Sequence, residues 1–168
     1  EGSQSESIPI FYRADIYELL KTEMFWLSKT PEKPSKGWDA ALNRITTYGI
    51  FVNRETLDTL HVFNTHYDHR GEKARVNSSH LLNSKLKSLK LLKKKVVLLG
   101  DFNSRPEDEP VKILNKAFAD AYSFSDKKAR GPLGTFNGFD PGATLDQRFD
   151  YVFLLNLSAW SYTAVDDN

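Results

Sequence analysis

The sequence predicts a layered α/β sandwich, and three features of the chain lead to this prediction. Short apolar runs rich in β-branched and aromatic residues stand on both sides of residues 74–92, where leucines recur with helical periodicity. The apolar run Val96 to Leu99 is typical of a buried strand. A second helix start follows at Pro110, and more strand-like runs come after it. The order strands, helix, buried strand, helix, strands fits an α/β domain better than an all-β or all-α domain.

The composition is that of an ordinary globular domain. With 168 residues, of which 40% are hydrophobic and 27% charged, the chain can bury one sizeable core. A formal net charge of +1 means that attraction to a polyanion must come from local patches. The absence of cysteine excludes disulfides, thiolate nucleophiles and cysteine-based zinc sites, and it is compatible with either redox compartment. No apolar run approaches the ~20 residues that span a bilayer.

The first part of the chain is expected to form strands. Residues 1–7 are small, polar and charged, which predicts a flexible lead-in to a domain over residues 8–168. Three short apolar runs then predict a strand meander: Ile8 to Tyr12, Ile16 to Leu20 and Met24 to Leu27. The turn residues within 28–37 predict a loop.

Two further runs predict a β-hairpin. Ile45 to Val52 and Leu60 to Asn64 are rich in β-branched and aromatic residues, and the four residues after Val52 fit a hairpin connection. If the second strand continues in extended form, then Asn64, His66 and Asp68 share one face. We expect this face to be functional.

The stretch Ala74 to Leu92 predicts an amphipathic helix, because Leu82, Leu86 and Leu89 recur at helical spacing. Six lysines lie between Lys85 and Lys95. We interpret them as a solvated helix face, and the alternative is an electrostatic footprint for nucleic acid or anionic lipid.

A second helix is expected to begin near Pro110, a favoured first-turn residue, with Val111, Leu114 and Phe118 on its apolar face. The charged, glycine-containing residues 123–132 predict a loop. Two strands are expected after it: Arg148 to Leu155 and Trp160 to Val165. Aromatic residues of the predicted strands are assigned to the core: Phe25, Trp26, Tyr48, Phe51, Phe63 and Phe153.

The polar residues that follow Val96 to Leu99 mark a candidate site. Gly100 stops the strand and permits a backbone path that a side chain would resist. Asp101 and Asn103 follow two apart, so on an extended backbone both side chains leave the same side of the strand's carboxyl end. Ligands bind at that end in open α/β sheets. Asp, Asn and Ser also favour plain turns, and spacing alone does not separate the two interpretations.

Several motifs are similar, in this order, to those of the endonuclease/exonuclease/phosphatase superfamily, which has the deoxyribonuclease I-like fold. The most specific are Asn64-Thr65-His66-Tyr67-Asp68-His69, Gly100-Asp101-Phe102-Asn103 and Arg148-Phe149-Asp150-Tyr151. Further matching residues are Trp26-Leu27-Ser28, Pro31, Trp38-Asp39, Arg44, Ala74-Arg75 and Thr135 to Phe139. The match extends from about Ile8 to Val165 and most resembles a subgroup whose strand carries Asn-Thr-His-Leu-Asp-His, with Tyr67 in place of the leucine.

The resemblance implies a phosphoesterase that hydrolyses P–O bonds by metal-assisted attack of water, with Mg²⁺ or Mn²⁺ as cofactor. Asp101 would activate or position the water on or near the metal, and Asn103 would orient its target or the phosphate. His66 would donate to a phosphate oxygen and stabilise the transition state. Asp150 corresponds to the family residue that orients the histidine of a terminal Ser-Asp-His element.

Arg44, His69 and Asn137 are the candidate substrate contacts under the same resemblance. The guanidinium of Arg44, like that of Arg75, matches phosphate oxygens in its fork geometry, although exposed arginines are common. His69 is expected to contact substrate or phosphate. Asn137 belongs to a loop that borders the substrate cleft in the family, or to a structural turn. A transition-metal site made by the His-x-Asp-His run is less favoured, because adjacent strand residues point to opposite faces.

The fold hosts several activities, so the expected substrate is any of several phosphate esters: nucleic acid, sugar or inositol phosphate, or a lipid phosphodiester. Family members begin with strands that carry a metal-site Asn and a metal-binding Glu, and these have no counterpart before Ile8. The resemblance therefore implies the middle and later part of a longer domain, monomeric if that domain is complete. The alternatives are a non-catalytic remnant or polyanion-binding module of this fold, and a component of a larger assembly.

Overall fold

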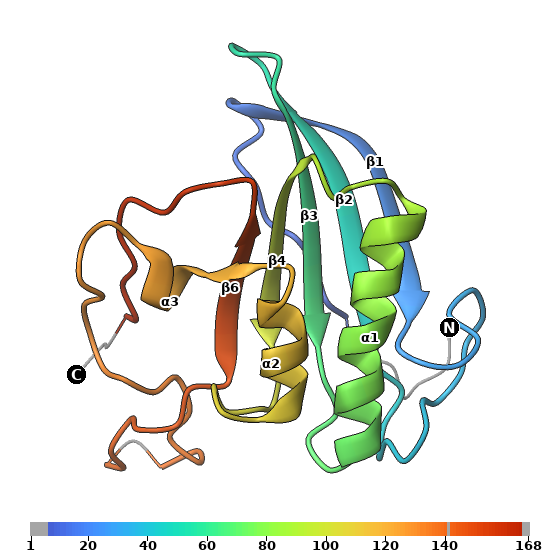
Figure 1. Ribbon diagram of the computed structural model, residues 1–168, viewed down its shortest axis with the longest axis vertical. Helices are drawn as coiled ribbons and strands as arrows, with labels where there is room; N and C mark the ends of the chain where they lie inside the picture. The colour runs from blue at the N-terminus through green and yellow to red at the C-terminus, as the bar shows by residue number, and fades with distance from the viewer. Residues whose placement is uncertain (1–6, 141, 166–168) are drawn as a thin grey trace.

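In the computed structural model, which describes residues 7–140 and 142–165, six strands form one mixed sheet and helices cover one of its faces (Figure 1). The strand order is β1-β2-β3-β4-β6-β5. The strands are β1 (Tyr17–Trp26), β2 (Ile45–Asn53), β3 (Thr59–His66), β4 (Lys95–Asp101), β5 (Ala119–Asp120) and β6 (Asp150–Leu155). The helices are α1 (Glu72–Ser88), α2 (Glu109–Asn115) and α3 (Ala121–Phe124). The predicted α/β class is confirmed, and the predicted lead-in lies, except for Ser7, outside the described residues.

The β3–α1–β4 unit places the ends of two strands side by side. β3 and β4 are parallel and α1 makes the crossover between them, whereas the other strand pairs of the described residues are antiparallel. Parallel neighbours end at the same edge of a sheet. His66, the last residue of β3, is accordingly the ladder partner of Asp101, the last residue of β4.

The core lies between the sheet and helices α1 and α2. Phe63, Leu98 and Phe153 are ladder partners on three neighbouring strands, and all three are buried. The helices complete this core with Leu82, Leu86, Val111 and Leu114. The six aromatic residues assigned to the core are buried, so that prediction is confirmed, although Trp26 and Phe51 are not part of the cluster that packs against the helices. Because side chains alternate along a strand, the residues between these core positions face away from the helices.

The predicted strand meander at the start of the chain is wrong. The second and third of these runs belong to one long strand, β1 (Tyr17–Trp26), whose pairing with β2 shifts register between Leu19 and Lys21. The polar residues after Leu20 do not break it, because β1 is an edge strand where charged side chains are exposed to solvent. Ile8 to Tyr12 is not a strand: it is held by side chains, with Asn64 Nδ2 donating to the Pro9 carbonyl at 2.7 Å.

Helix α1 begins and ends two to four residues away from the predicted limits. Asp39 accepts hydrogen bonds from the amides of Lys73 and Ala74 and caps the helix from a distant loop. The helix ends in a Schellman motif, in which Leu91 N donates to Leu86 O at 2.8 Å and Lys90 adopts a φ of 57°. The predicted extension to Leu92 therefore fails.

In the last part of the chain, one of the two predicted strands is found and the other is not. The hairpin between β2 and β3, the start of α2 and strand β6 are confirmed, whereas β5 and α3 were not predicted. Trp160 to Val165 is not a strand. Its ladder contact within the described residues is the single bridge between Thr163 and Arg130, so it has no neighbouring strand to extend along.

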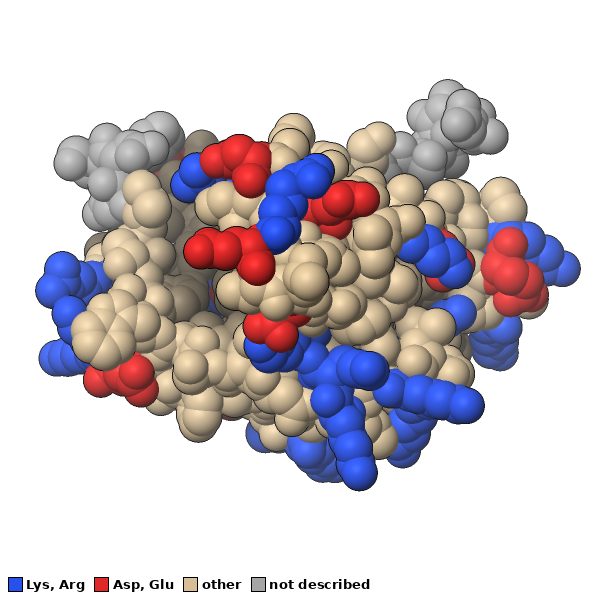
Figure 2. Space-filling model, turned by 90° about the horizontal axis from the view of Figure 1, so that it is seen from above, with Lys and Arg blue, Asp and Glu red and all other residues tan. Residues whose placement is uncertain are grey.

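The six lysines gather where α1 ends and β4 begins, and Figure 2 shows Lys and Arg side chains grouped along this border of the molecule. Lys95 pairs with Asp58 at 2.8 Å, and Lys85 lies over the Phe25 ring. Lys95 and Asp101 are opposite ends of β4, so these lysines lie at the far end of the sheet from the candidate site. None of the helices in residues 7–140 and 142–165 has the length and apolar character needed to cross a bilayer.

Candidate active site

Three polar side chains form a row across the ends of three neighbouring strands. His66 is the ladder partner of Asp101, and Asp101 is the ladder partner of Asp150. Ladder partners project to the same side of a sheet, and this side is the one that α1 and α2 leave uncovered. His66 Nε2 lies 3.5 Å from Asp101 Oδ2, and their side chains are 29% and 33% exposed. His66 and Asp101 are therefore in contact, and the row is open to solvent.

Backbone hydrogen bonds fix the strand ends that carry this row. Tyr67 N donates to Asp101 O at 2.8 Å, and Asn103 Nδ2 donates back to Tyr67 O at 2.9 Å. Asp101 Oδ1 accepts from Asn103 N at 2.7 Å. Gly100 does not stop the strand as predicted, because it is paired within β4. It has a φ of 135°, and a Cβ there would lie 1.8 Å from Thr65 O, so the close approach of β4 to β3 requires glycine. Asn103, at a φ of 44°, is both a turn residue and a neighbour of the row.

Arg44 holds both histidines that the sequence singled out. Its Nη1 lies 3.0 Å from His66 Nδ1, and its Nη2 lies 3.2 Å from His69 Nδ1. Because a guanidinium has donors and no acceptors, each Nδ1 accepts, and the ring proton of each histidine sits on Nε2. The Nε2–H of His66 is thereby directed to Asp101. Because Arg44 is buried and held in place, it orients His66. His69 is exposed.

Asp68 organises the backbone rather than sharing the functional face. It is 2% exposed, and its two oxygens accept from the amides of Ala41, Leu42, Arg70 and Gly71. Burial by itself raises the pKa of Asp68, and these four N–H groups together outweigh it, so the pKa lies well below its usual range. The prediction that Asp68 shares a face with His66 is wrong, because β3 ends at His66. With both oxygens occupied, the His-x-Asp-His metal alternative loses support.

Asp150 stands beside Asp101 and is supported by Thr135. The hydroxyl oxygen of Thr135 accepts from the amides of Phe149 and Asp150 at 3.1 and 3.0 Å. Desolvation raises the pKa of Asp150, and the Asp101 carboxylate raises it further, against the lowering effect of the Thr135 hydrogen bond and the His66 ring. Thr135 lies in the Thr135 to Phe139 motif, in which Asn137, and not Thr135, was the predicted site residue.

Two other candidates are engaged elsewhere. Arg75 Nη1 donates to the Asp68 carbonyl at 3.0 Å, which is a structural contact. Asn137 Oδ1 accepts from Phe139 N at 3.0 Å in a local turn, as the structural alternative for this residue supposed. Neither side chain has a hydrogen bond to His66, Asp101 or Asp150 in the described residues. Their proposed roles toward substrate stay predictions.

The oxygen atoms that the row and Asn103 offer as metal ligands suit a hard divalent cation that is only partly enclosed. Within residues 7–140 and 142–165, no group of three or more His, Asp and Glu side chains is arranged to hold a metal ion. Mg²⁺ is often bound by one or two carboxylates, with water and substrate phosphate completing its ligands. Asp101 and Asp150 offer carboxylates and Asn103 an amide oxygen, which fit an open site of that kind.

Comparison with solved structures identifies related proteins. An endonuclease/exonuclease/phosphatase family protein from Bacteroides thetaiotaomicron is 39% identical, with a TM-score of 0.80 over 86% of this chain and 54% of that one. A mannosyl-6-phosphatase from the same organism is 40% identical, with a TM-score of 0.79 over 86% of this chain and 55% of that one. A functionally unknown conserved protein from Enterococcus faecalis is 26% identical, with a TM-score of 0.85 over 94% of this chain and 62% of that one.

The chain thus spans about half the length of the first two of these structures. A scan against protein-family models finds no match, and neither does a comparison with the curated proteins. The structural likeness and the shared identity carry the assignment instead. Together with the order of the three motifs along the chain, they place this protein in the endonuclease/exonuclease/phosphatase superfamily.

Proposed function

We propose that this protein hydrolyses phosphate esters with the help of Mg²⁺ or Mn²⁺. The observation that carries the proposal is the row of His66, Asp101 and Asp150 on three neighbouring strands. A phosphate ester needs an activated water and groups that neutralise the charge building on its oxygens. The row offers a carboxylate for the first task and an N–H donor for the second within 3.5 Å of each other.

Each side chain has a distinct task in this proposal. Asp101 accepts the proton of the attacking water or positions that water. His66 turns its Nε2–H from Asp101 to a phosphate oxygen, and Arg44 keeps the ring in the tautomer that can donate. Asn103 and Asp150, beside Asp101, would complete the ligands of a divalent cation, which supplies positive charge next to the phosphate oxygens. Exposed His69 contributes to substrate binding.

The finer proposal concerns the substrate. A related structure at 40% identity is that of a mannosyl-6-phosphatase, so we take a sugar phosphate as the first candidate. Proteins of the same fold act on nucleic acids, inositol phosphates and lipid phosphodiesters, so these esters are tested as well. A non-catalytic, polyanion-binding role is the second candidate, favoured by the exposed lysines at the far end of the sheet.

The test is metal-dependent hydrolysis by the 168-residue chain. The substrates are mannose 6-phosphate, an artificial diester, DNA, RNA, an inositol polyphosphate and sphingomyelin, each with Mg²⁺, Mn²⁺ or EDTA. Asp101→Ala is expected to lower kcat/KM by ~10³-fold. The matched control is Asp58→Ala, which removes an exposed carboxylate at the other end of the sheet.

Turnover that needs metal, survives Asp58→Ala and disappears in Asp101→Ala supports the proposal and names the substrate class. A folded chain that hydrolyses none of these esters but binds DNA or anionic vesicles overturns it in favour of the second candidate. Turnover that persists undiminished in Asp101→Ala also overturns it.

A further inference from the structure

The segment that carries Thr135 is fastened to the residues that lead into β6. The amides of Thr135 and Phe136 both donate to Gln147 O, at 2.8 and 3.1 Å. The ring of Phe136 lies 5.4 Å, between centroids, from the ring of Phe149. These contacts bring the side chain of Thr135 to the start of β6.

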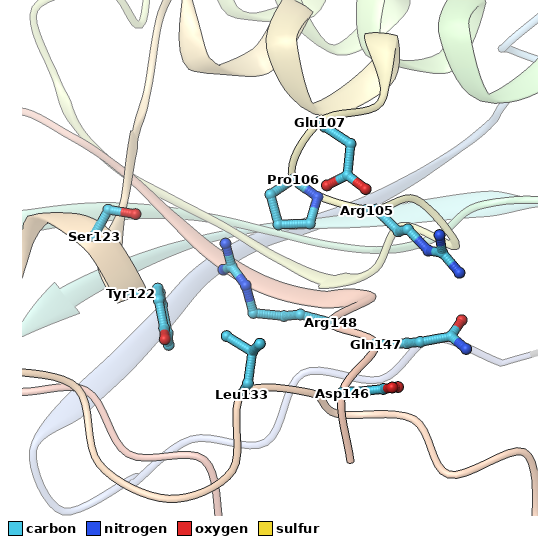
Figure 3. Close-up of a pocket in the computed structure, with 9 residues that line it drawn as sticks. All are labelled: Arg105, Pro106, Glu107, Tyr122, Ser123, Leu133, Asp146, Gln147 and Arg148. Atoms are coloured by element: carbon cyan, nitrogen blue, oxygen red, sulfur yellow. The ribbon is translucent and has the colours of Figure 1, made fainter. Parts of the chain in front are cut away.

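Arg148, two residues before Asp150, fixes the same stretch of backbone. It is buried, and its Nη1 and Nη2 donate to the two carboxylate oxygens of Asp120 at 3.0 and 2.6 Å. Its Cζ lies 4.5 Å from the ring centroid of Tyr122, and Figure 3 shows both side chains in the wall of a cavity of about 450 Å³. Because the backbone that enters β6 is held in this way, Thr135 has a constant position relative to Asp150.

The hydroxyl group of Thr135 can accept two hydrogen bonds and donate one. Its oxygen accepts from Phe149 N at 3.1 Å and from Asp150 N at 3.0 Å, so both lone pairs are used. The proton is left for an acceptor, and the carboxylate of Asp150 is in reach: desolvation raises the pKa of this carboxyl group, and the hydrogen bond with the Thr135 side chain lowers it. One hydroxyl group therefore contacts both the backbone and the carboxylate of Asp150.

The carboxylate of Asp150 needs a restraint, because its surroundings do not fix it. Asp150 is exposed at the beginning of β6, so packing alone leaves several side-chain rotamers open to it. Its ladder partner is Asp101, and two neighbouring carboxylates repel each other. Without a restraint, this repulsion favours rotamers that turn Asp150 away from Asp101.

We infer that Thr135 is a positioning residue, whose hydroxyl group holds the carboxylate of Asp150 beside that of Asp101. The consequence for catalysis rests on the proposed hydrolysis, in which both carboxylates lie next to one divalent cation. The orientation of Asp150 does not rest on it, because it is a property of the chain without metal. A threonine that only supported the backbone would accept from the two amides and leave the rotamer of Asp150 unchanged.

The first test measures the χ1 angle of Asp150 by NMR in EDTA, from the three-bond couplings of its Cγ to the backbone N and carbonyl carbon. The unchanged chain and Thr135→Ser, which keeps the hydroxyl group, are expected to show the couplings of a single rotamer. Thr135→Val keeps the shape but not the hydroxyl group, and its couplings are expected to be averaged over several rotamers. The control is Thr144→Val, the same change at an exposed position before β6, which should leave the single rotamer.

The second test compares kcat and KM of the same variants on a substrate that the chain hydrolyses. Thr135→Val is expected to lower kcat by about 10-fold or more with little change in KM, because the residue acts through Asp150. Thr135→Ser should retain most of kcat, and Thr144→Val all of it. Circular dichroism establishes that each variant is folded.

Averaged couplings of Asp150 in the unchanged chain overturn the inference, whether or not Thr135→Val folds. A single rotamer that Thr135→Val leaves in place also overturns it, because the hydroxyl group then supports the backbone alone. If the couplings change as expected and no phosphate ester is hydrolysed, the proposed function fails while the positioning role of Thr135 stands. An undiminished kcat in Thr135→Val with a released rotamer overturns the consequence for catalysis.

Discussion

The guanidinium of Arg44 donates to Nδ1 of His66 across 3.0 Å, and this one contact decides which ring nitrogen of the histidine carries the proton. The proton on Nε2 then faces the carboxylate of Asp101 at 3.5 Å. Arg44 is itself fixed by its neighbour Asp68, 3.7 Å from its Nε. The buried Arg44 therefore determines which nitrogen of His66 can donate within the solvent-exposed row.

Arg44→Lys is expected to lower kcat by about 10- to 100-fold with a smaller effect on KM, because lysine cannot hold both histidines in the Nε2–H form. Long-range ¹H–¹⁵N NMR correlations of the imidazoles report the tautomer directly. The control is Arg54→Lys, whose exposed arginine pairs with Glu18 at 3.1 Å. An unchanged Nε2–H tautomer of His66 in Arg44→Lys would contradict the assigned role.

Asp150→Asn is expected to raise the denaturation midpoint at neutral pH while lowering activity by about 10²-fold. The folded-state pKa of Asp150 is raised, so ionisation favours the unfolded chain, and stability is lost as pH rises from about 3.9 through the folded pKa. Asparagine carries no charge and avoids this loss. Urea denaturation in EDTA at several pH values measures the effect.

The stabilising effect of Asp150→Asn should vanish below about pH 3.9, where the carboxyl group is protonated in both states. Asp126→Asn, at an exposed loop position, is the control and should show no such pH dependence. A midpoint at neutral pH that is lower in Asp150→Asn than in the unchanged chain would refute the prediction.

Asp68→Ala is expected to destabilise the fold by about 3–5 kcal/mol, because it leaves four amides and the Arg44 guanidinium without their buried acceptor. The pKa of Asp68 is lowered, so its contribution is present above about pH 3.9 and is lost as pH falls through the folded pKa. The difference between the two chains should therefore shrink in acid. Equilibrium urea denaturation measures it, with Asp58→Ala, at an exposed ion pair, as the control that leaves the midpoint nearly unchanged.

Gly100→Ala is expected to cost about 3 kcal/mol or more, since a Cβ would lie 1.8 Å from Thr65 O at a φ of 135°. Gly138→Ala is the matched control: its φ is also positive, at 66°, but no atom lies within 4 Å of the added Cβ. It should cost about 1–2 kcal/mol. Equal losses of stability for the two changes would show that backbone conformation, and not the approach of β3 to β4, makes glycine necessary at position 100.

Periodicity in the sequence was sufficient for the layered fold and for the elements with strong local signals. The leucine spacing of α1 and the apolar run of β4 gave these elements correctly, because both patterns depend on residues near one another in the chain. The prediction of a strand meander at the start of the chain was wrong for the opposite reason. Whether polar residues end a strand depends on whether that strand lies at an edge of the sheet, and only the pairing of β1 with β2 shows that it does.

The candidate site, too, could be predicted only in part from the sequence. The sequence motifs singled out His66, Asp101 and Asp150 as separate residues, and the order of the motifs indicated the family. Their alignment in one row depends on the register of β3 with β4 and of β4 with β6, which long-range core packing sets.

The partners of these residues were determined by tertiary structure alone. The sequence by itself determined the α/β class, the buried strand β4 and the polar residues at the strand ends, because each is encoded within a few neighbouring positions. The contacts of Arg44 with His66 and of Arg148 with Asp120 join residues 22 and 28 positions apart. No local pattern encodes such pairs, because a side chain's partner is chosen by how the whole chain packs.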